Sequence, residues 1–121
     1  YSLAGITNPK KEINIAEVYD AFTYQELMWI EGLGLAEYGT AGKLLEKGFF
    51  DKKGKLPINP SGGLLSGHPV IAAGLYRIAE VVLQLRGEAG GRQVNAKIGV
   101  AHGINGICGQ SHCVWILDKE K

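Results

Sequence analysis

Residues 59–87 read NPSGGLLSGHPVIAAGLYRIAEVVLQLRG and join an irregular stretch to a long apolar one. The range 56–67 holds two prolines and three glycines, which exclude a regular helix or a central strand. From Pro69 to Leu85 apolar residues cover most of the circumference of a helix, and Gly87 suits its end. We therefore expect a glycine-rich loop followed by a largely buried helix that lies between a sheet and a further layer.

Strands are expected before and after this helix in the sequence. β-Branched residues and partial alternation predict them at 13–19, 97–101 and 112–117, with the glycine-rich loop 103–110 joining the last two. Together with the helices, this order predicts an α/β domain in which a mixed β-sheet is covered by helices, over residues 1–121.

Shorter helical segments are expected before the apolar helix. Thr23 and Glu26 have the spacing of a capping box, which predicts the start of an amphipathic helix. A helix is also expected over 40–47, and residues 1–4 have the composition of a last helical turn ended by Gly5.

The composition excludes several classes of protein. The 121 residues include 45% hydrophobic residues, 18 glycines without a period of three, and a net charge of +1. Disordered, collagen-like and nucleic-acid-binding chains are therefore disfavoured, and no apolar stretch is long enough to span a membrane. Two cysteines are too few for a disulfide framework, which favours the cytoplasm. The chain begins at Tyr1 and has Met28 as its sole methionine, so we expect a fragment or a processed product.

His68 is the first candidate for chemistry, because it lies at the junction of the glycine-rich loop and the apolar helix. Free N–H groups and the positive end of a helix dipole keep a histidine neutral there, so that it can polarise a carbonyl or take a proton. The alternative is that His68 caps the helix. The same loop predicts close backbone approach to a ligand at Asn59, Gly62 and Gly63.

The loop 103–110 is the second candidate, because its glycines allow N–H groups to converge as an oxyanion hole. A plain hairpin loop is the alternative. Cys108, His112 and Cys113 are too few for zinc, and neighbouring strand residues point to opposite faces, so no metal is expected. Two buried thiols are the preferred interpretation.

Tyr19 and Asp20 are the third candidate, at the carboxyl end of the first expected strand. Ligands of α/β sheets commonly bind there. A core aromatic and an aspartate that helps to cap a helix are the alternative.

Motifs in a fixed order carry a resemblance over nearly the whole chain: AEVYDAFT (16–23), NPSGG (59–63), GHP (67–69), QLRGEA (84–89) and GVAHG (99–103). They resemble the C-terminal half of thiolases, in particular the branch with archaeal and bacterial thiolase-like proteins and sterol-carrier-protein thiolases. The resemblance implies one of two similar halves of an α/β fold, with the N-terminal half and its nucleophilic cysteine absent from this chain.

The resemblance also implies roles for residues. His68 matches the histidine that activates the nucleophile and helps to bind the thioester oxygen, and Tyr19 matches the residue that completes this oxyanion hole. Gly106 matches the glycine of the thiolase Cys-x-Gly motif, but a gap-free match places Ile104 at the acid–base cysteine. A shifted loop would offer Cys108 for proton transfer. Tyrosine at position 19 resembles the steroid side-chain aldolases of the same fold.

The function implied by this resemblance is acyl transfer, or carbon–carbon bond cleavage or formation, at a coenzyme A thioester. Neither a metal nor a further cofactor is expected, and the chain is expected to be inactive without the N-terminal half. A retro-aldolase, and a non-catalytic subunit that binds acyl-CoA or a partner, are the alternatives. Thiolases are oligomers, and members of this branch pair with an OB-fold zinc-ribbon protein, so both kinds of assembly are expectations.

Overall fold

A mixed three-stranded sheet forms the centre of the computed structural model, which describes residues 1–106 and 109–120. Its strands are β1 (Ile15–Glu17), β2 (Ile98–Asn105) and β3 (Ser111–Asp118), in the order β1–β2–β3. β1 runs parallel to β2, with Ile15 opposite Gly99, and β2 runs antiparallel to β3, with His102 opposite Val114. Ile58 adds an isolated parallel bridge to Ala16 at the outer edge of β1. The mixed sheet confirms the α/β class.

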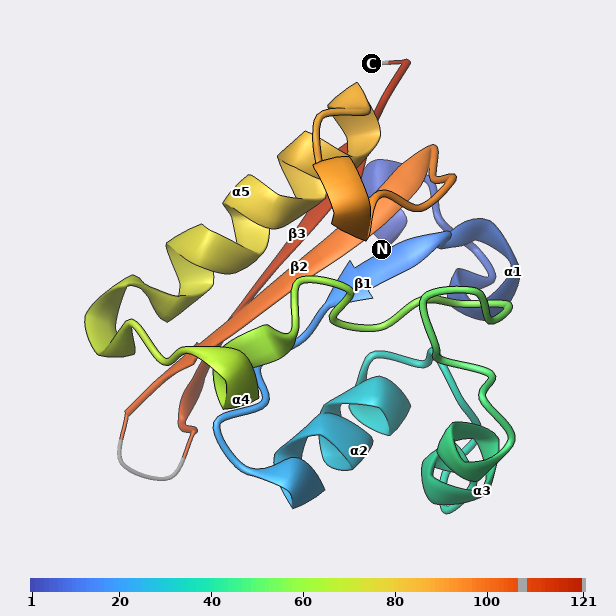
Figure 1. Ribbon diagram of the computed structural model, residues 1–121. Helices are drawn as coiled ribbons and strands as arrows, with labels where there is room; N and C mark the ends of the chain where they lie inside the picture. Colours follow the sequence, from blue (N-terminus) through green and yellow to red (C-terminus); the bar gives the residue numbers. More distant parts are fainter. Residues whose placement is uncertain (107–108, 121) are drawn as a thin grey trace.

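Helical segments connect and cover these strands. They are η1 (Ser2–Ala4), α1 (Pro9–Glu12), α2 (Thr23–Gly32), α3 (Ala41–Glu46), α4 (Gly63–Ser66), η2 (Val70–Ala72), α5 (Ala73–Arg86) and η3 (Gly90–Arg92). α5 lies along one face of the sheet, and α2 and α3 lie on the other (Figure 1). None of the helices in the described ranges is long and apolar enough to cross a membrane.

Strand alternation divides the core between the two faces of the sheet. Ile15 and Ala101 pack with Val81 and Leu85 of α5. Their strand neighbours point the other way, and Ala16, Val18 and Val100 pack with the layer of α2 and α3. Both faces of β1 and of the first half of β2 are covered, which fits their nearly continuous apolar runs, whereas β3 is exposed from Ser111 to Trp115.

Helix α5 contacts β2 closely because glycines lie at the crossing points. A Cβ on Gly99 would lie 2.5 Å from Val81 Cγ1, and one on Gly103 would lie 3.1 Å from the Gly74 Cα. The helix ends at Gly87, whose φ of 78° is left-handed, as the sequence predicts.

The prediction that the segment from Pro69 to Leu85 is largely buried is wrong for one side of it. Regular α-helix begins only at Ala73, after the 3₁₀ turn η2. The outward-facing apolar side chains are exposed; they are Val70, Ile71, Leu75 and Tyr76. The sheet buries the inner face, but nothing in the described chain covers the outer one.

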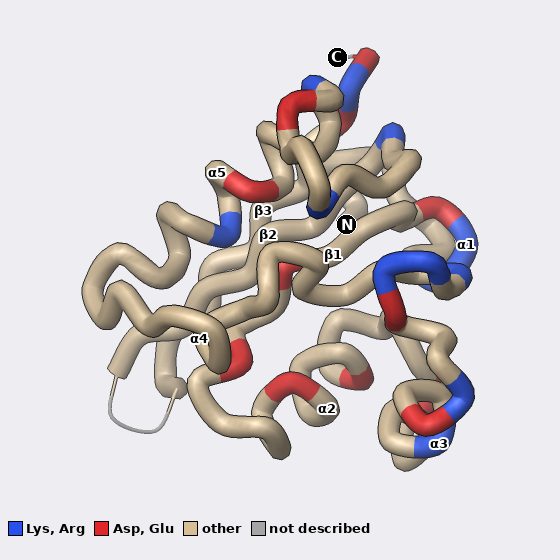
Figure 2. The backbone as a smooth tube through the Cα atoms, in the orientation of Figure 1, with Lys and Arg blue, Asp and Glu red and all other residues tan. Residues whose placement is uncertain are grey.

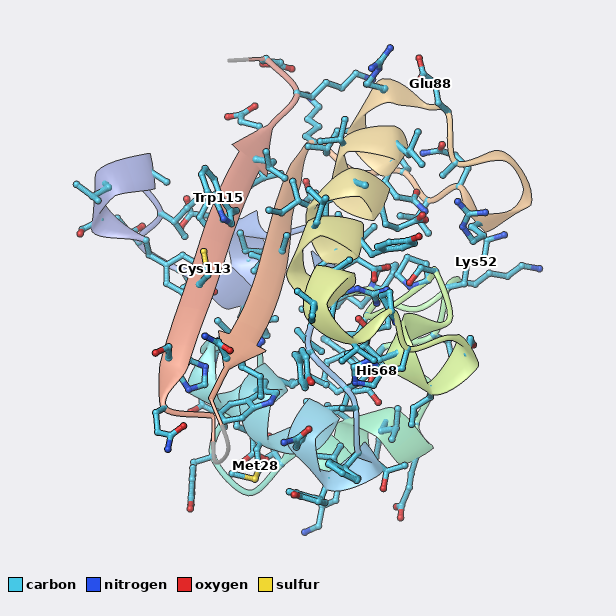
Figure 3. All side chains as sticks on the ribbon, turned by 90° about the vertical axis from the view of Figure 1, so that its left-hand side faces the viewer. Met28, Lys52, His68, Glu88, Cys113 and Trp115 are labelled. Atoms are coloured by element: carbon cyan, nitrogen blue, oxygen red, sulfur yellow. The ribbon has the colours of Figure 1, made fainter. Side chains whose placement is uncertain are left out.

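Four local predictions are corrected by the structure. Thr23 and Glu26 form no capping box: Phe22 is the N-cap of α2 without a side-chain hydrogen bond, and Glu26 instead accepts one from Asn59. The irregular range 56–67 contains the single turn α4. β2 extends to Asn105, so the hairpin connection is shorter than expected. Cys113 is exposed on β3 rather than buried (Figure 3), and Cys108 lies outside the described residues.

Candidate active site

Tyr19 and His68, which lie 49 residues apart in sequence, meet where β1 ends and the glycine-rich loop enters η2. The Tyr19 hydroxyl lies 3.4 Å from His68 Nε2. Their rings contact edge to face, with centroids 6.0 Å apart and planes at 83°. Figure 3 shows His68 between α2 and the N-terminal end of α5. The two predicted catalytic residues are therefore brought together.

A backbone amide sets the protonation pattern of His68. The Val70 N–H donates to His68 Nδ1 at 2.9 Å. A neutral ring that accepts at Nδ1 carries its proton on Nε2, so Nε2–H is a donor aimed at the Tyr19 hydroxyl. Val70 has a φ of 52°, a strained value for a β-branched residue. His68 Nδ1 therefore accepts a hydrogen bond from the backbone of the turn that follows, while Nε2 faces the Tyr19 hydroxyl.

A buried ion pair holds the loop that leads to His68. Glu17 is fully buried and accepts hydrogen bonds from Arg77 Nη1 at 2.6 Å and from Ser61 Oγ at 2.7 Å. The Ser61 backbone N–H also donates to Glu17, at 3.1 Å. Burial raises the pKa of the Glu17 carboxyl to about 7, and Arg77 and Ser61 oppose this rise. The network ties β1, the loop and α5 together.

Asn59 and Gly63, predicted to contact a ligand, are engaged inside the fold. Asn59 Oδ1 accepts the Val18 N–H at 2.7 Å, and Asn59 Nδ2 donates to Glu26 Oε1 at 3.0 Å. Gly63 is buried with a φ of 64°, and a Cβ there would lie 1.8 Å from Asp20 Oδ2. Both residues therefore fix the path of the loop.

Two further predicted residues meet at the turn α4, one exposed and one buried. Gly62 is exposed in the left-handed region and begins α4. Asp20 is 2% exposed, and its Oδ1 accepts the Leu64 N–H at 2.7 Å, so this carboxylate orders the same turn.

A cavity of about 410 Å³ opens beside Tyr19. Gly106, a predicted site residue with a φ of 92°, lines it together with Ile104. The remaining lining side chains are mainly apolar or aromatic; they include Ala21, Phe22, Tyr24, Met28 and Trp29. Sequence reasoning missed those on α2, because apolar residues in an amphipathic helix were assigned to the core. Phe22, Tyr24 and Met28 are each more than half exposed.

Two histidines stack behind Tyr19. The His102 ring is 2% exposed, and its Nε2 lies 3.0 Å from Nδ1 of His112. The rings are nearly parallel, at 10°, and Trp29 contacts both edge to face. Within the described residues, no group of three His, Cys, Asp or Glu side chains is placed to hold a metal ion.

The His102 pair predicts a loss of stability in acid. Burial, and then the neighbouring His112, lower the pKa of His102 from 6.5 to about 4. Between these values the unfolded chain binds more protons, so the free energy of unfolding falls as the pH drops from about 6.5 to 4. The contribution of this group is about 3 kcal/mol. The contribution of Glu17 has the opposite pH dependence, because its raised pKa stabilises the folded chain at acid pH.

Denaturant unfolding of the wild type and of His102→Leu across pH 4–7 measures this contribution. The free energy of unfolding of the wild type minus that of the variant should fall by about 3 kcal/mol toward acid pH, because only the wild type must keep an uncharged imidazole buried. A difference between the two free energies of unfolding that does not change with pH would contradict the low pKa of His102.

Two segments that form this end of the molecule are uncharged, since the ranges 61–76 and 98–117 contain no Lys, Arg, Asp or Glu. Figure 2 shows the basic residues mainly around α1, α3 and the far end of α5, whereas acidic residues also lie on α2 and beside α4. The site therefore offers neutral hydrogen-bond donors rather than cations.

Comparisons with known proteins identify the family of the chain. The family model described as "Thiolase C-terminal domain-like" matches residues 1–119. The chain is 47% identical over 100 residues to the "Acetyl-CoA acetyltransferase" of Methanothermobacter thermautotrophicus, covering 81% of this chain and 26% of that protein. It is 49% identical over 95 residues to "Sterol carrier protein 2" of Bos taurus, covering 77% of this chain and 18% of that one.

A solved structure of an aldolase has a similar fold. The "Ltp2-ChsH2(DUF35) aldolase" superimposes with a TM-score of 0.79 at 29% identity, over 100% of this chain and 30% of that chain. The chain thus spans less than a third of the length of each of these three relatives. The whole-chain family match, together with this fold, shows that the chain belongs to the thiolase C-terminal domain-like family.

Proposed function

We propose that this chain is the C-terminal-type half, residues 1–121, of an enzyme that acts on coenzyme A thioesters. The observation that carries the proposal is the contact between the Tyr19 hydroxyl and His68 Nε2, 3.4 Å apart at the end of β1. A thioester oxygen placed beside both atoms, at hydrogen-bond distance from each, would accept hydrogen bonds from both. Donors fixed before the reaction stabilise the charge that develops on such an oxygen.

The tautomer of His68 favours an electrophilic role over that of a base. Nδ1 is occupied by the Val70 N–H, and Nε2 then carries the proton. His68 would therefore donate to the thioester oxygen as negative charge develops there. This stabilisation serves a tetrahedral intermediate of acyl transfer and an enolate of carbon–carbon cleavage equally well.

Two named reactions fit this site. Thiolase-type acyl transfer is supported by the similarity to an acetyl-CoA acetyltransferase. A retro-aldol cleavage is supported by the structural similarity to an aldolase and by the phenol of Tyr19 at the site. Ile104 lines the cavity next to Tyr19 and has no proton to exchange, which favours the aldolase or a non-catalytic acyl-CoA subunit over the Claisen reaction.

The remaining parts of the site would come from outside this chain. A nucleophile and a cationic site for the coenzyme A phosphates are needed, whereas the chain spans less than a third of its relatives, and Arg77 beside the His68 loop is buried and paired with Glu17. The 121 residues alone should therefore show no thiolysis of acetoacetyl-CoA. Thiolysis by the isolated chain above a buffer control would contradict the proposal that the nucleophile lies outside these residues.

Substitution of His68 tests the proposed role. In the full-length protein, His68→Ala should lower kcat for thioester turnover by about 10²–10³-fold, the usual cost of one oxyanion donor. Steady-state kinetics of thiolysis and of retro-aldol cleavage measure this effect and separate the two reactions. His68→Asn, which keeps an N–H donor, is the matched control and should retain more activity. Unchanged kcat in His68→Ala would make His68 a structural cap only.

Assembly and location are part of the same proposal. The substrate is an acyl-CoA, with no metal or further cofactor, in the cytoplasm. A homo-oligomer or a complex with an OB-fold zinc-ribbon protein is proposed; the structural relative is named as an aldolase together with a DUF35 protein. The exposed apolar side of α5 is available for such contacts.

A further inference from the structure

The backbone amide of Tyr19 is held by a histidine that the chemistry above does not use. The Tyr19 N–H donates to Nδ1 of His102 at 3.4 Å, and Nε2 of His102 lies 3.0 Å from Nδ1 of His112. We propose that His102 and His112 are positioning residues for Tyr19: His112 fixes the tautomer of His102, and His102 holds the amide of Tyr19. This inference rests on the proposed function, because it gives Tyr19 its place beside His68.

The direction of each hydrogen bond follows from the first one. A backbone N–H can only donate, so Nδ1 of His102 accepts and the proton of the neutral ring lies on Nε2. That Nε2–H then donates to Nδ1 of His112, whose own proton lies on Nε2. The chain of donors therefore runs from Tyr19 through His102 and His112 in a single arrangement.

A proton added to His112 breaks this arrangement. A cationic His112 carries N–H on both nitrogens, so its Nδ1–H would face the Nε2–H of His102. His102 could relieve the clash by moving its proton to Nδ1, but that proton would then face the Tyr19 N–H. No state with a cationic His112 keeps both hydrogen bonds, so protonation of His112 releases Tyr19.

The surroundings of the pair leave His112, and not His102, open to solvent. The cavity of about 260 Å³ over the two rings is lined by the apolar residues Trp29, Leu33 and Val114, and by Gly32. α5 lies on the opposite face of the sheet (Figure 1). His102 is buried whereas His112 is exposed.

Kinetics of the full-length protein test the positioning role. His102→Leu should lower kcat about tenfold and change KM for the thioester less than about twofold, because orientation and not binding is lost. His102→Asn places an oxygen near the position of Nδ1 and should restore much of the loss. Equal kcat values for the leucine and asparagine variants, or a loss expressed mainly in KM, would overturn the proposal.

The pH profile and a labelled amide test the role of His112. His112→Asn keeps an acceptor that does not titrate, so it should move the acid limb of kcat to lower pH. In the wild type labelled with ¹⁵N-tyrosine, the Tyr19 amide resonance should shift as the pH falls, and this shift should be absent in His112→Asn. Identical amide titrations in the two proteins would overturn the inference. The amide experiment needs no turnover, so it decides even if the proposed function fails.

Discussion

Replacing Arg77 with methionine should lower the free energy of unfolding by about 3–5 kcal/mol at neutral pH, because it leaves the Glu17 carboxyl buried without its cation. Arg77 is 4% exposed, and its Nη1 lies 2.6 Å from Glu17 Oε2. Without the guanidinium, burial would raise the pKa of Glu17 further. The folded chain would then hold a proton that the unfolded chain releases above its ordinary pKa of 4.5. The variant should therefore go on losing stability as the pH rises above about 7, where the contribution of Glu17 in the wild type levels off.

Denaturant unfolding at several pH values measures this effect. Arg86→Met is the matched control, since Arg86 forms an exposed pair with Glu88 at 3.0 Å and should change stability little. Glu17→Leu combined with Arg77→Met removes both charges and should recover part of the loss, although Ser61 then keeps two unpaired donors. Equal effects of Arg77→Met and Arg86→Met would show that the buried pair does not stabilise the fold.

Gly63→Ala should be the most damaging conservative change in the His68 loop, at roughly 2–4 kcal/mol. Its Cβ would lie 1.8 Å from Asp20 Oδ2, in a buried turn where φ is 64°. Either the Asp20 bond to the Leu64 N–H breaks or α4 shifts, and both displace His68. Turnover by the full-length protein should therefore fall together with stability.

Gly67→Ala controls for the change of residue type in the same loop. Gly67 has an extended φ of −177° and no heavy atom within 4 Å of a built Cβ, so this variant should match the wild type. Thermal unfolding of the two alanine variants measures the difference. A Gly63→Ala protein as stable and active as Gly67→Ala would contradict the assigned path of the loop.

Features determined by local sequence were predictable. The end of α5 at Gly87 and the irregular loop before His68 follow from glycine and proline placement, which acts within a few residues. The capping box at Thr23 failed because Asn59, 33 residues from Glu26, takes the glutamate as its partner. The outer face of α5 is apolar but exposed, because apolar periodicity identifies a face to be covered and not the segment that covers it.

The site depended on contacts between distant residues. The periodicity of the sequence does not place Tyr19 beside His68. The resemblance of the motifs to thiolases pointed to this contact, and the Tyr19 hydroxyl lies 3.4 Å from His68 Nε2. The stacking of His102 on His112 was missed altogether. His102 lies in an apolar strand, and the ten residues that separate it from His112 reveal nothing about strand register.

The central claim is that His68 donates a hydrogen bond to a thioester oxygen, and the carbonyl of a bound substrate reports this directly. In the full-length protein, the ¹³C resonance of an acyl-CoA labelled at the thioester carbon should move downfield on binding, because a donor polarises the carbonyl. In His68→Ala the ligand should still bind, but its resonance should stay close to that of the free thioester. The same downfield shift in both proteins would contradict the account.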